Sequence, residues 1–239
     1  MKKFFTLVAS LLLAFGAANA QELQFQYDFN RSKDAGTPYN IATITGTHFD
    51  NWGSTFYFVN FDFAKTAGKT IYGEIQRAFN FWSDTALKDF YLELEYDGGV
   101  LSGFGGDISQ AVLAGAAYSF HDETFRNFLQ FQVLYRHNFI RNQQNIPIQL
   151  TAVYTLKDLF NVEGLLLVGF ADFWWQDNFV AGKETHRVFM AKPQLWYNVG
   201  KFVGVDNFNI GGQVEITANC FSAEKTWVFN PAAGVRWTF

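Results

Sequence analysis

Apolar and polar side chains alternate with a period of two along the last stretch of the chain, residues 225–239. Successive side chains of a β-strand point to opposite faces, so this stretch predicts a strand with one apolar and one polar face. A closed membrane barrel needs an apolar face toward lipid and has no free edge, whereas a bare apolar strand in a soluble sheet invites aggregation. The last strand of a soluble β-sandwich is the alternative. The apolar positions are Trp227, Phe229, Pro231, Ala233, Val235, Trp237 and Phe239.

The same alternation recurs along most of the chain. It predicts about twelve strands of roughly ten residues, the length with which a tilted strand crosses a bilayer. The predicted fold is therefore all-β, a transmembrane antiparallel β-barrel. The predicted strands are residues 23–29, 39–49, 57–63, 70–81, 90–96, 110–120, 129–136, 148–155, 162–173, 189–198, 208–216 and 225–239.

The predicted connections differ in length, and this difference suggests an orientation. Residues 157–161 form a tight connection, and the longer connections alternate with short ones. Outer-membrane barrels have short periplasmic turns and longer extracellular loops. With both termini in the periplasm, Gly103 and Asn178 are expected outside the cell and Asp158 in the periplasm. Residues 200–207 are an exception, because they are long for a periplasmic turn. The long connections are residues 97–107, 175–184 and 217–225.

Residues 1–20 have the features of a secretory signal. Two lysines precede a short apolar run, and a small-x-small cleavage site ends at Ala20. The apolar run is shorter than the ~20 residues that a transmembrane helix needs. We therefore expect a signal peptide at residues 1–20 and one outer-membrane β-barrel domain at residues 21–239.

Composition agrees with a barrel that covers its outside with apolar side chains. Aromatic residues make up 19% of the chain, including 29 Phe, and charged residues only 17%. Removing the signal removes two lysines and changes the net charge from −4 to −6, which argues against a nucleic-acid partner. The one cysteine, Cys220, can form neither an intramolecular disulfide nor a cysteine-based metal cluster. We expect no cofactor and no metal site.

The residues between the apolar positions are expected to line the lumen. They mix acids, bases, amides and large aromatics, whereas a general cation or anion pore favours one sign of charge. A mixed lining suits a neutral, ring-bearing solute, because aromatics stack on rings and charged groups hydrogen-bond hydroxyls. The opposing interpretation is that these charges pair with one another and plug a small barrel. The candidate pore-lining residues are Phe56, Phe58, Asp62, Glu93, Glu95, Arg136, Lys192, Trp196 and Glu215.

Several stretches resemble one family of channels. Residues 48–54, HFDNWGS, with the following FYF and NFD runs, resemble the early hairpin of a subgroup of Tsx-like nucleoside-specific channels. Residues 147–172 are similar to that family's late hairpin, and the final GVRWTF also fits. The aromatic end looks like the terminal signature that the outer-membrane assembly machinery reads. The resemblance implies a twelve-stranded barrel in the bacterial outer membrane that passes nucleosides by diffusion through a narrow pore.

Three functions remain open: a substrate-selective channel, a small structural or adhesive barrel with a plugged lumen, and an outer-membrane enzyme acting on lipids. An enzyme needs a nucleophile, a base and an orienting group within reach of one another. The sequence contains no Gly-x-Ser-x-Gly elbow and no His pair at metal spacing. Ser102 and His137 are the candidates for such a pair, and ordinary rim residues are the simpler interpretation. We expect a passive channel for nucleosides or similar small solutes and no enzyme.

Overall fold

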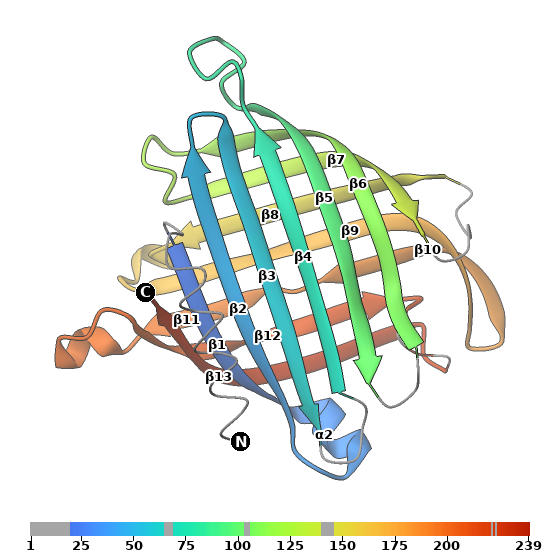
Figure 1. The fold of residues 1–239 in the computed structure, drawn as a ribbon. Coiled ribbons are helices and arrows are strands. Elements are labelled where there is room, and N and C mark those ends of the chain that lie inside the picture. Colours follow the sequence, from blue (N-terminus) through green and yellow to red (C-terminus); the bar gives the residue numbers. More distant parts are fainter. Residues whose placement is uncertain (1–19, 65–68, 103–105, 140–145, 221, 223) are drawn as a thin grey trace.

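The computed structural model of this chain forms a closed β-barrel (Figure 1). It describes residues 20–64, 69–102, 106–139, 146–220, 222 and 224–239. Apart from Ala20, the expected signal segment lies outside the described residues. No helix in the described ranges is long and apolar enough to cross a membrane.

The elements follow one another along the chain with short connections. The strands are β1 Ala20–Asp28, β2 Tyr39–Asp50, β3 Gly53–Ala64, β4 Lys69–Phe79, β5 Phe90–Ser102, β6 Gly106–His121, β7 Phe128–Asn138, β8 Ile148–Lys157, β9 Leu165–Val180, β10 Lys183–Ala191, β11 Gln194–Asn198, β12 Phe208–Ala218 and β13 Trp227–Thr238. The helices are α2 Phe29–Ala35 and the 3₁₀ turns η1 Leu159–Asn161 and η2 Gly200–Val203.

The barrel is closed by pairing between its first and last strands. β13 pairs antiparallel with both β12 and β1, and Val235 lies opposite Phe25. All other neighbours in the sheet are also antiparallel. Closure gives every strand a partner on both sides, which is what a bilayer core without water requires of backbone polar groups. The predicted antiparallel barrel is confirmed.

One strand of the barrel is interrupted at Pro193. β10 and β11 both lie between β9 and β12, so together they occupy a single place and the barrel has twelve strands. Proline has no N–H to donate to the ladder. The ladder continues around it, because the N–H of Lys192 donates to the carbonyl of Phe170 and the N–H of Val214 donates to the carbonyl of Pro193, both at 3.0 Å.

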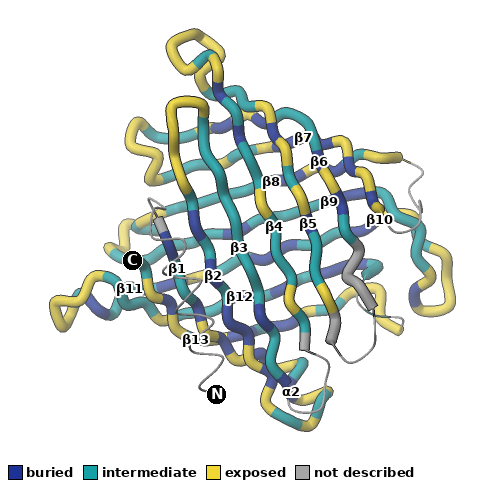
Figure 2. The backbone as a smooth tube through the Cα atoms, viewed as in Figure 1, coloured by how far each residue is buried: buried dark blue, intermediate teal, exposed yellow. Residues whose placement is uncertain are grey.

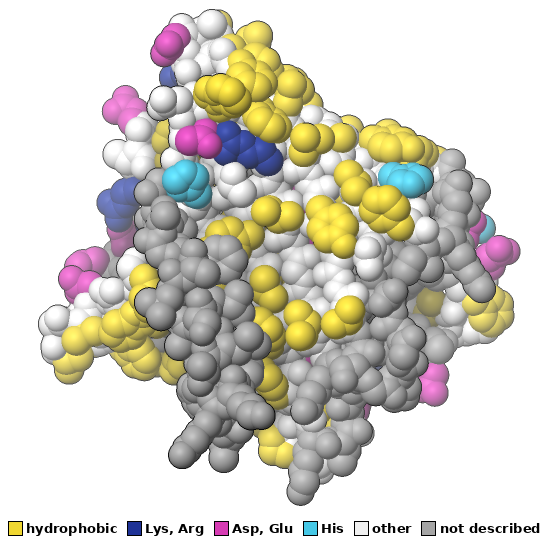
Figure 3. Space-filling view, viewed as in Figure 1, with side chains coloured by type: hydrophobic (Ala, Val, Ile, Leu, Met, Phe, Trp, Pro, Cys, Tyr) yellow, Lys and Arg dark blue, Asp and Glu magenta, His cyan; other side chains and the backbone are white. Residues whose placement is uncertain are grey.

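The two faces of each strand differ in chemistry. On β7, the outward positions Phe131, Val133 and Tyr135 are exposed, whereas the inward Gln132 and Arg136 are buried. Figure 2 shows buried and exposed positions succeeding one another along the strands. Hydrophobic side chains spread over the viewed face in Figure 3, and charged ones gather mainly toward its margins. This outer surface is suited to lipid.

The termini define one end of the barrel, which we call the terminal end. Glu22 lies opposite Thr238, and the N–H of Phe239 donates to the carbonyl of Gln21 at 2.9 Å. The opposite, distal end carries α2 and the tip of the β9–β10 hairpin (Figure 1). The η1 and η2 turns lie at the terminal end.

The prediction that the connections are long at one end of the barrel and short at the other is wrong. Residues 97–107 and 175–184 are mostly strand: β5 extends to Ser102, β9 extends to Val180 and includes Asn178, and the β9–β10 turn is only residues 181–182. Several terminal-end connections are longer than that turn, including residues 80–89 and 199–207. Gly98 and Gly99 in the first stretch, and the polar run of residues 176–178 in the second, interrupt the apolar alternation and so concealed these strand extensions. Gly103 lies outside the described residues.

Because loop length does not reveal which end of the barrel faces outside the cell, we test the orientation with labels at two exposed glutamates, one at each end. Glu184, at the distal hairpin tip, and Glu163, in the terminal-end turn, are both exposed. Asp158 is a poor choice for labelling, because its Oδ1 accepts the Gly164 N–H at 2.8 Å, a bond that also holds the pKa of Asp158 below its usual range. In a Cys220→Ser background, we expect an impermeant maleimide on intact cells to label Glu184→Cys but not Glu163→Cys. The reverse pattern would invert the orientation.

If the outer face of the barrel contacts lipid, a charged substitution there should lower stability more than one on the inner face. Val133 is 55% exposed on the outer face of β7, and an Arg near the bilayer midplane costs about 2–4 kcal/mol. We expect Val133→Arg to lower the unfolding free energy in urea-titrated liposomes by that amount. The matched control is Gln130→Arg on the inner face of the same strand, where a smaller loss is expected. Equal losses would contradict the assignment of faces.

Candidate functional site

The predicted pore-lining residues all lie on the inward-facing positions of the barrel. Strand register and burial set this placement, and it was predicted from alternation alone. They do not form one cluster, however, and are distributed over separate parts of the wall. Phe56, Phe58 and Asp62 lie on β3, Glu93 and Glu95 on β5, Arg136 on β7, Lys192 before Pro193, Trp196 on β11, and Glu215 on β12.

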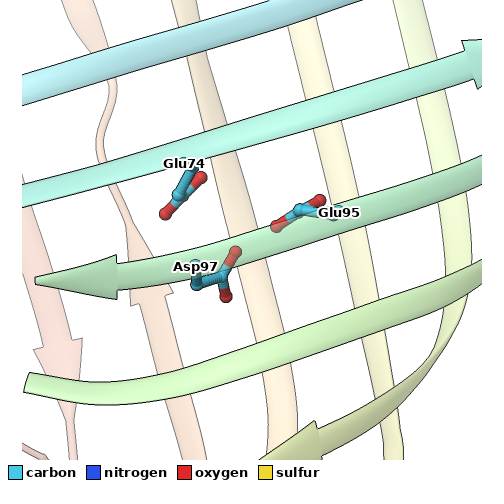
Figure 4. A group of neighbouring side chains, drawn as sticks. All are labelled: Glu74, Glu95 and Asp97. Carbon is cyan, nitrogen blue, oxygen red and sulfur yellow. The ribbon is translucent and has the colours of Figure 1, made fainter.

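Three carboxylates converge on the inner wall between β4 and β5. Oxygen atoms of Glu74, Glu95 and Asp97 lie within 4.8 Å of one another (Figure 4). Strand register explains the convergence, because Glu74 lies opposite Asp97, and Glu95 precedes Asp97 by two positions on the same face of β5. Carboxylate oxygens are ligands of hard cations, and they repel one another when ionised. We call these three residues the carboxylate group.

Arg136 ties the carboxylate group to the neighbouring strands. Its Nη1 donates to Asp97 Oδ2 at 3.0 Å and to Gln149 Oε1 at 2.6 Å, and its Nε donates to Asn138 Oδ1 at 3.1 Å. The guanidinium also lies 5.3 Å from the centre of the Trp174 ring. Side chains of three strands therefore hold this buried arginine, and its positive charge is paired with Asp97 of the wall.

Asp172 is a further acidic residue on this part of the wall. Thr151 Oγ1 donates to its Oδ1 at 2.6 Å, and Gln149, which accepts from Arg136, donates to the same Thr151 oxygen at 3.0 Å. Alternation does not single out Asp172, because it stands among apolar residues on both faces of the predicted strand 162–173.

A second charged cluster lies toward the distal end. Asp28 caps α2 by accepting the N–H of Arg31 at 2.7 Å, and this places the Arg31 side chain against both Asp28 and Glu215. Lys192 Nζ also approaches Glu215 Oε2, at 3.3 Å. Next to them, Tyr39 Oη donates to Asp62 at 2.9 Å. The helix thereby brings a basic group from a connection into the barrel, which strand alternation cannot predict.

Aromatic rings line the wall beside the carboxylate group. The ring centroids of Phe56 and Phe58 are 6.2 Å apart, and those of Phe58 and Tyr72 are 6.0 Å apart. Phe58 lies directly opposite Glu74 in the sheet, and Tyr72 Oη donates to Glu74 Oε1 at 2.7 Å. We call Phe56, Phe58 and Tyr72 the aromatic strip. It places flat apolar surfaces next to hydrogen-bond acceptors.

Two predicted residues are held apart from these groups. Trp196 is 0% exposed, donates to Gln194 Oε1 at 2.9 Å and packs against Gly211, where a Cβ atom would lie 2.9 Å from the indole. Glu93 is 2% exposed, and neither of its carboxylate oxygens has a hydrogen-bond partner among the described residues. His137, a member of the proposed enzymatic pair, lies on the outer face of β7, away from the lumen.

A family model with the description "Domain of unknown function (DUF5020)" matches residues 20–239. The chain belongs to the DUF5020 family. No protein of curated function matches this DUF5020 sequence. The matching model is not that of the Tsx-like channels, so that resemblance is not confirmed.

The DUF5020 barrel is similar to several solved structures. The NanC porin is similar with a TM-score of 0.56 at 8% identity, over 92% of this chain and 98% of that chain. The KdgM porin gives 0.47 at 11% identity, over 92% and 99%. Omp33 of Acinetobacter baumannii gives 0.42 at 12% identity, over 94% and 100%. The likeness to the NanC porin supports the closed barrel fold, and the apolar outer face agrees with the predicted location in the outer membrane.

The Arg136–Asp97 pair gives a stability prediction. Removing one partner of a buried ion pair leaves an uncompensated charge and costs about 3–5 kcal/mol. We expect Arg136→Met to lower the unfolding free energy by this amount, and Arg136→Met with Asp97→Asn to recover most of it, as measured by urea titration in liposomes. As a control, Arg126→Met breaks the exposed pair with Asp158 in the terminal-end turns and should change stability little. Equal losses in the single and double Arg136 variants would contradict the pairing.

Proposed function

We propose that this barrel is a passive channel of the outer membrane for small ring-bearing solutes, with nucleosides as the leading candidates. The observation that carries the proposal is the aromatic strip beside the carboxylate group on the inner wall. A nucleoside presents a flat base and a hydroxylated sugar, and the two neighbouring surfaces offer a complementary contact to each. Lipid is the partner of the outer face, and the assembly machinery of outer-membrane barrels is the expected partner during insertion.

The strength of such contacts is compatible with transport. Stacking on an aromatic ring contributes about 1–3 kcal/mol per base, and hydrogen bonds to ionised acceptors are stronger than those between neutral groups. A channel must bind its solute well enough to admit it and weakly enough to release it. Stacking on one or two rings, such as Phe58 and Tyr72, is strong enough to admit the solute and weak enough to release it.

The relatives add support at a coarser level. The NanC barrel, whose fold this chain shares, is described as a porin. The resemblance of residues 48–62 to the early hairpin of Tsx-like channels points to nucleosides among the solutes of porin-like barrels. Nucleoside selectivity thus rests on the wall chemistry and on that resemblance together.

The alternative function is a structural or adhesive barrel with a filled lumen. Leu113, Leu134 and Trp196 are inward-facing and fully buried, so parts of the inner wall are packed with side chains. Arg31 and Lys192 also reach toward acidic residues at the distal end. A filled barrel would assemble normally and conduct nothing, which separates the two functions by experiment.

Liposome swelling with purified protein tests the proposal. We expect adenosine and uridine to enter faster than neutral solutes of similar size. Phe58→Ala should lower nucleoside entry or its preference over those solutes, because it removes the central ring of the aromatic strip. The matched control is Phe63→Ala, the same substitution on the outward face of β3, which should leave entry unchanged.

Two results would count against this proposal. If no solute enters proteoliposomes containing correctly folded barrel, the filled-lumen function replaces the channel. If solutes enter at rates set by size alone, and Phe58→Ala changes nothing, the channel stands but the nucleoside site does not.

A further inference from the structure

Acidic side chains outnumber basic ones on the inner wall. Nine carboxylates and four basic groups are buried or half-buried there among the described residues, counting Arg31, which α2 directs into the barrel. The carboxylates are Glu22, Asp28, Asp62, Glu74, Glu93, Glu95, Asp97, Asp172 and Glu215, and the basic groups are Arg31, Arg136, Lys192 and Arg236.

Each of the four basic groups is already engaged in an ion pair. Arg236 pairs with Glu22, Arg136 with Asp97, and Lys192 and Arg31 share Glu215, with Arg31 also on Asp28. Five acidic residues have no basic group within 4.0 Å in the described part of the chain. These unpaired carboxylates are Asp62, Glu74, Glu93, Glu95 and Asp172.

The unpaired carboxylates are not confined to one strand pair. Asp62 lies on β3, Glu74 on β4, Glu93 and Glu95 on β5, and Asp172 on β9, all at inward-facing positions. Acidic groups from several strands of the barrel therefore face the same lumen. Glu93 lies on the same inner face, apart from the carboxylate group; it is buried, and both of its oxygens are without a hydrogen-bond partner among the described residues.

We infer that these five carboxylates make the channel prefer cations and reject anionic solutes. The inference rests on the proposed channel function and names its substrate class more closely: neutral or cationic ring-bearing solutes, and not their phosphorylated or carboxylated counterparts. Rings of Asp and Glu select cations in channels, because a narrow, partly dehydrated lumen strengthens charge interactions. A phosphate group carries roughly −1.5 to −2 charges at neutral pH, so a nucleoside phosphate meets repulsion that a nucleoside does not.

The direct test is the reversal potential of the purified wild-type protein in a planar bilayer under a KCl gradient. We expect the sign given by K⁺ permeation and a K⁺ to Cl⁻ permeability ratio above one. The ratio should be larger at low than at high salt, because salt screens charges at a distance. In parallel liposome assays, adenosine should enter faster than adenosine monophosphate.

The combined variant Glu74→Gln, Glu95→Gln and Asp172→Asn should shift the permeability ratio toward one and narrow the difference between the two adenosine compounds. These substitutions keep side-chain size, and folding is checked by the heat-dependent shift in gel mobility. The control is Glu123→Gln, an exposed acid in the β6–β7 turn, which should leave the ratio unchanged.

The outcomes separate the inference from the function on which it rests. Absence of conductance by folded wild-type protein overturns both. Conductance with Cl⁻ permeating as well as or better than K⁺ overturns the selectivity and leaves the channel. A ratio above one that the triple variant does not change also overturns the assignment to these carboxylates.

Discussion

The structure depends on one constraint: a backbone N–H or C=O inside a bilayer has no water to bond and must find its partner within the protein. Closure by β13 against β1 meets this constraint, since no strand among the described residues keeps a free edge. The same constraint explains why Pro193 is tolerated. Bonds on either side of it, from Lys192 and to its own carbonyl, carry the ladder past the missing donor.

Closure also divides the side chains into two environments. Outward positions face lipid and are apolar, while inward positions share a narrow space. Some charged groups there form ion pairs, and others remain unpaired. Arg136 shows the first solution, with three side-chain acceptors and an aromatic ring around one guanidinium. Glu74, Glu93 and Glu95 show the second, and a barrel that retains such acids is more consistent with a functional lumen than with a packed core.

Alternation predicted the barrel and the inward placement of residues such as Phe58, Glu95 and Arg136, because the period-two rule applies wherever one face meets lipid. It did not predict which inward residues meet, since contacts depend on register between strands. The sequence predicts a connection that begins at Asp97, because Gly98 and Gly99 interrupt the apolar alternation. In the structure, β5 continues through Asp97. Alternation does not predict the position of Arg31, because Arg31 reaches the lumen from the helical connection α2. Asp28 caps that helix by accepting the N–H of Arg31, and this holds Arg31 near the lumen.

The central claim is that the inner wall beside the carboxylate group borders a water-filled path through the barrel. The most direct measurement is the reactivity of single cysteines along β4, in a Cys220→Ser background and a lipid bilayer, with a small water-soluble thiol reagent. The account predicts that Tyr72→Cys, Glu74→Cys and Gln76→Cys react, while Ile71→Cys and Ile75→Cys, on the lipid face, do not. Unreactive cysteines at all three inward positions in correctly folded protein would show a filled lumen and contradict the account.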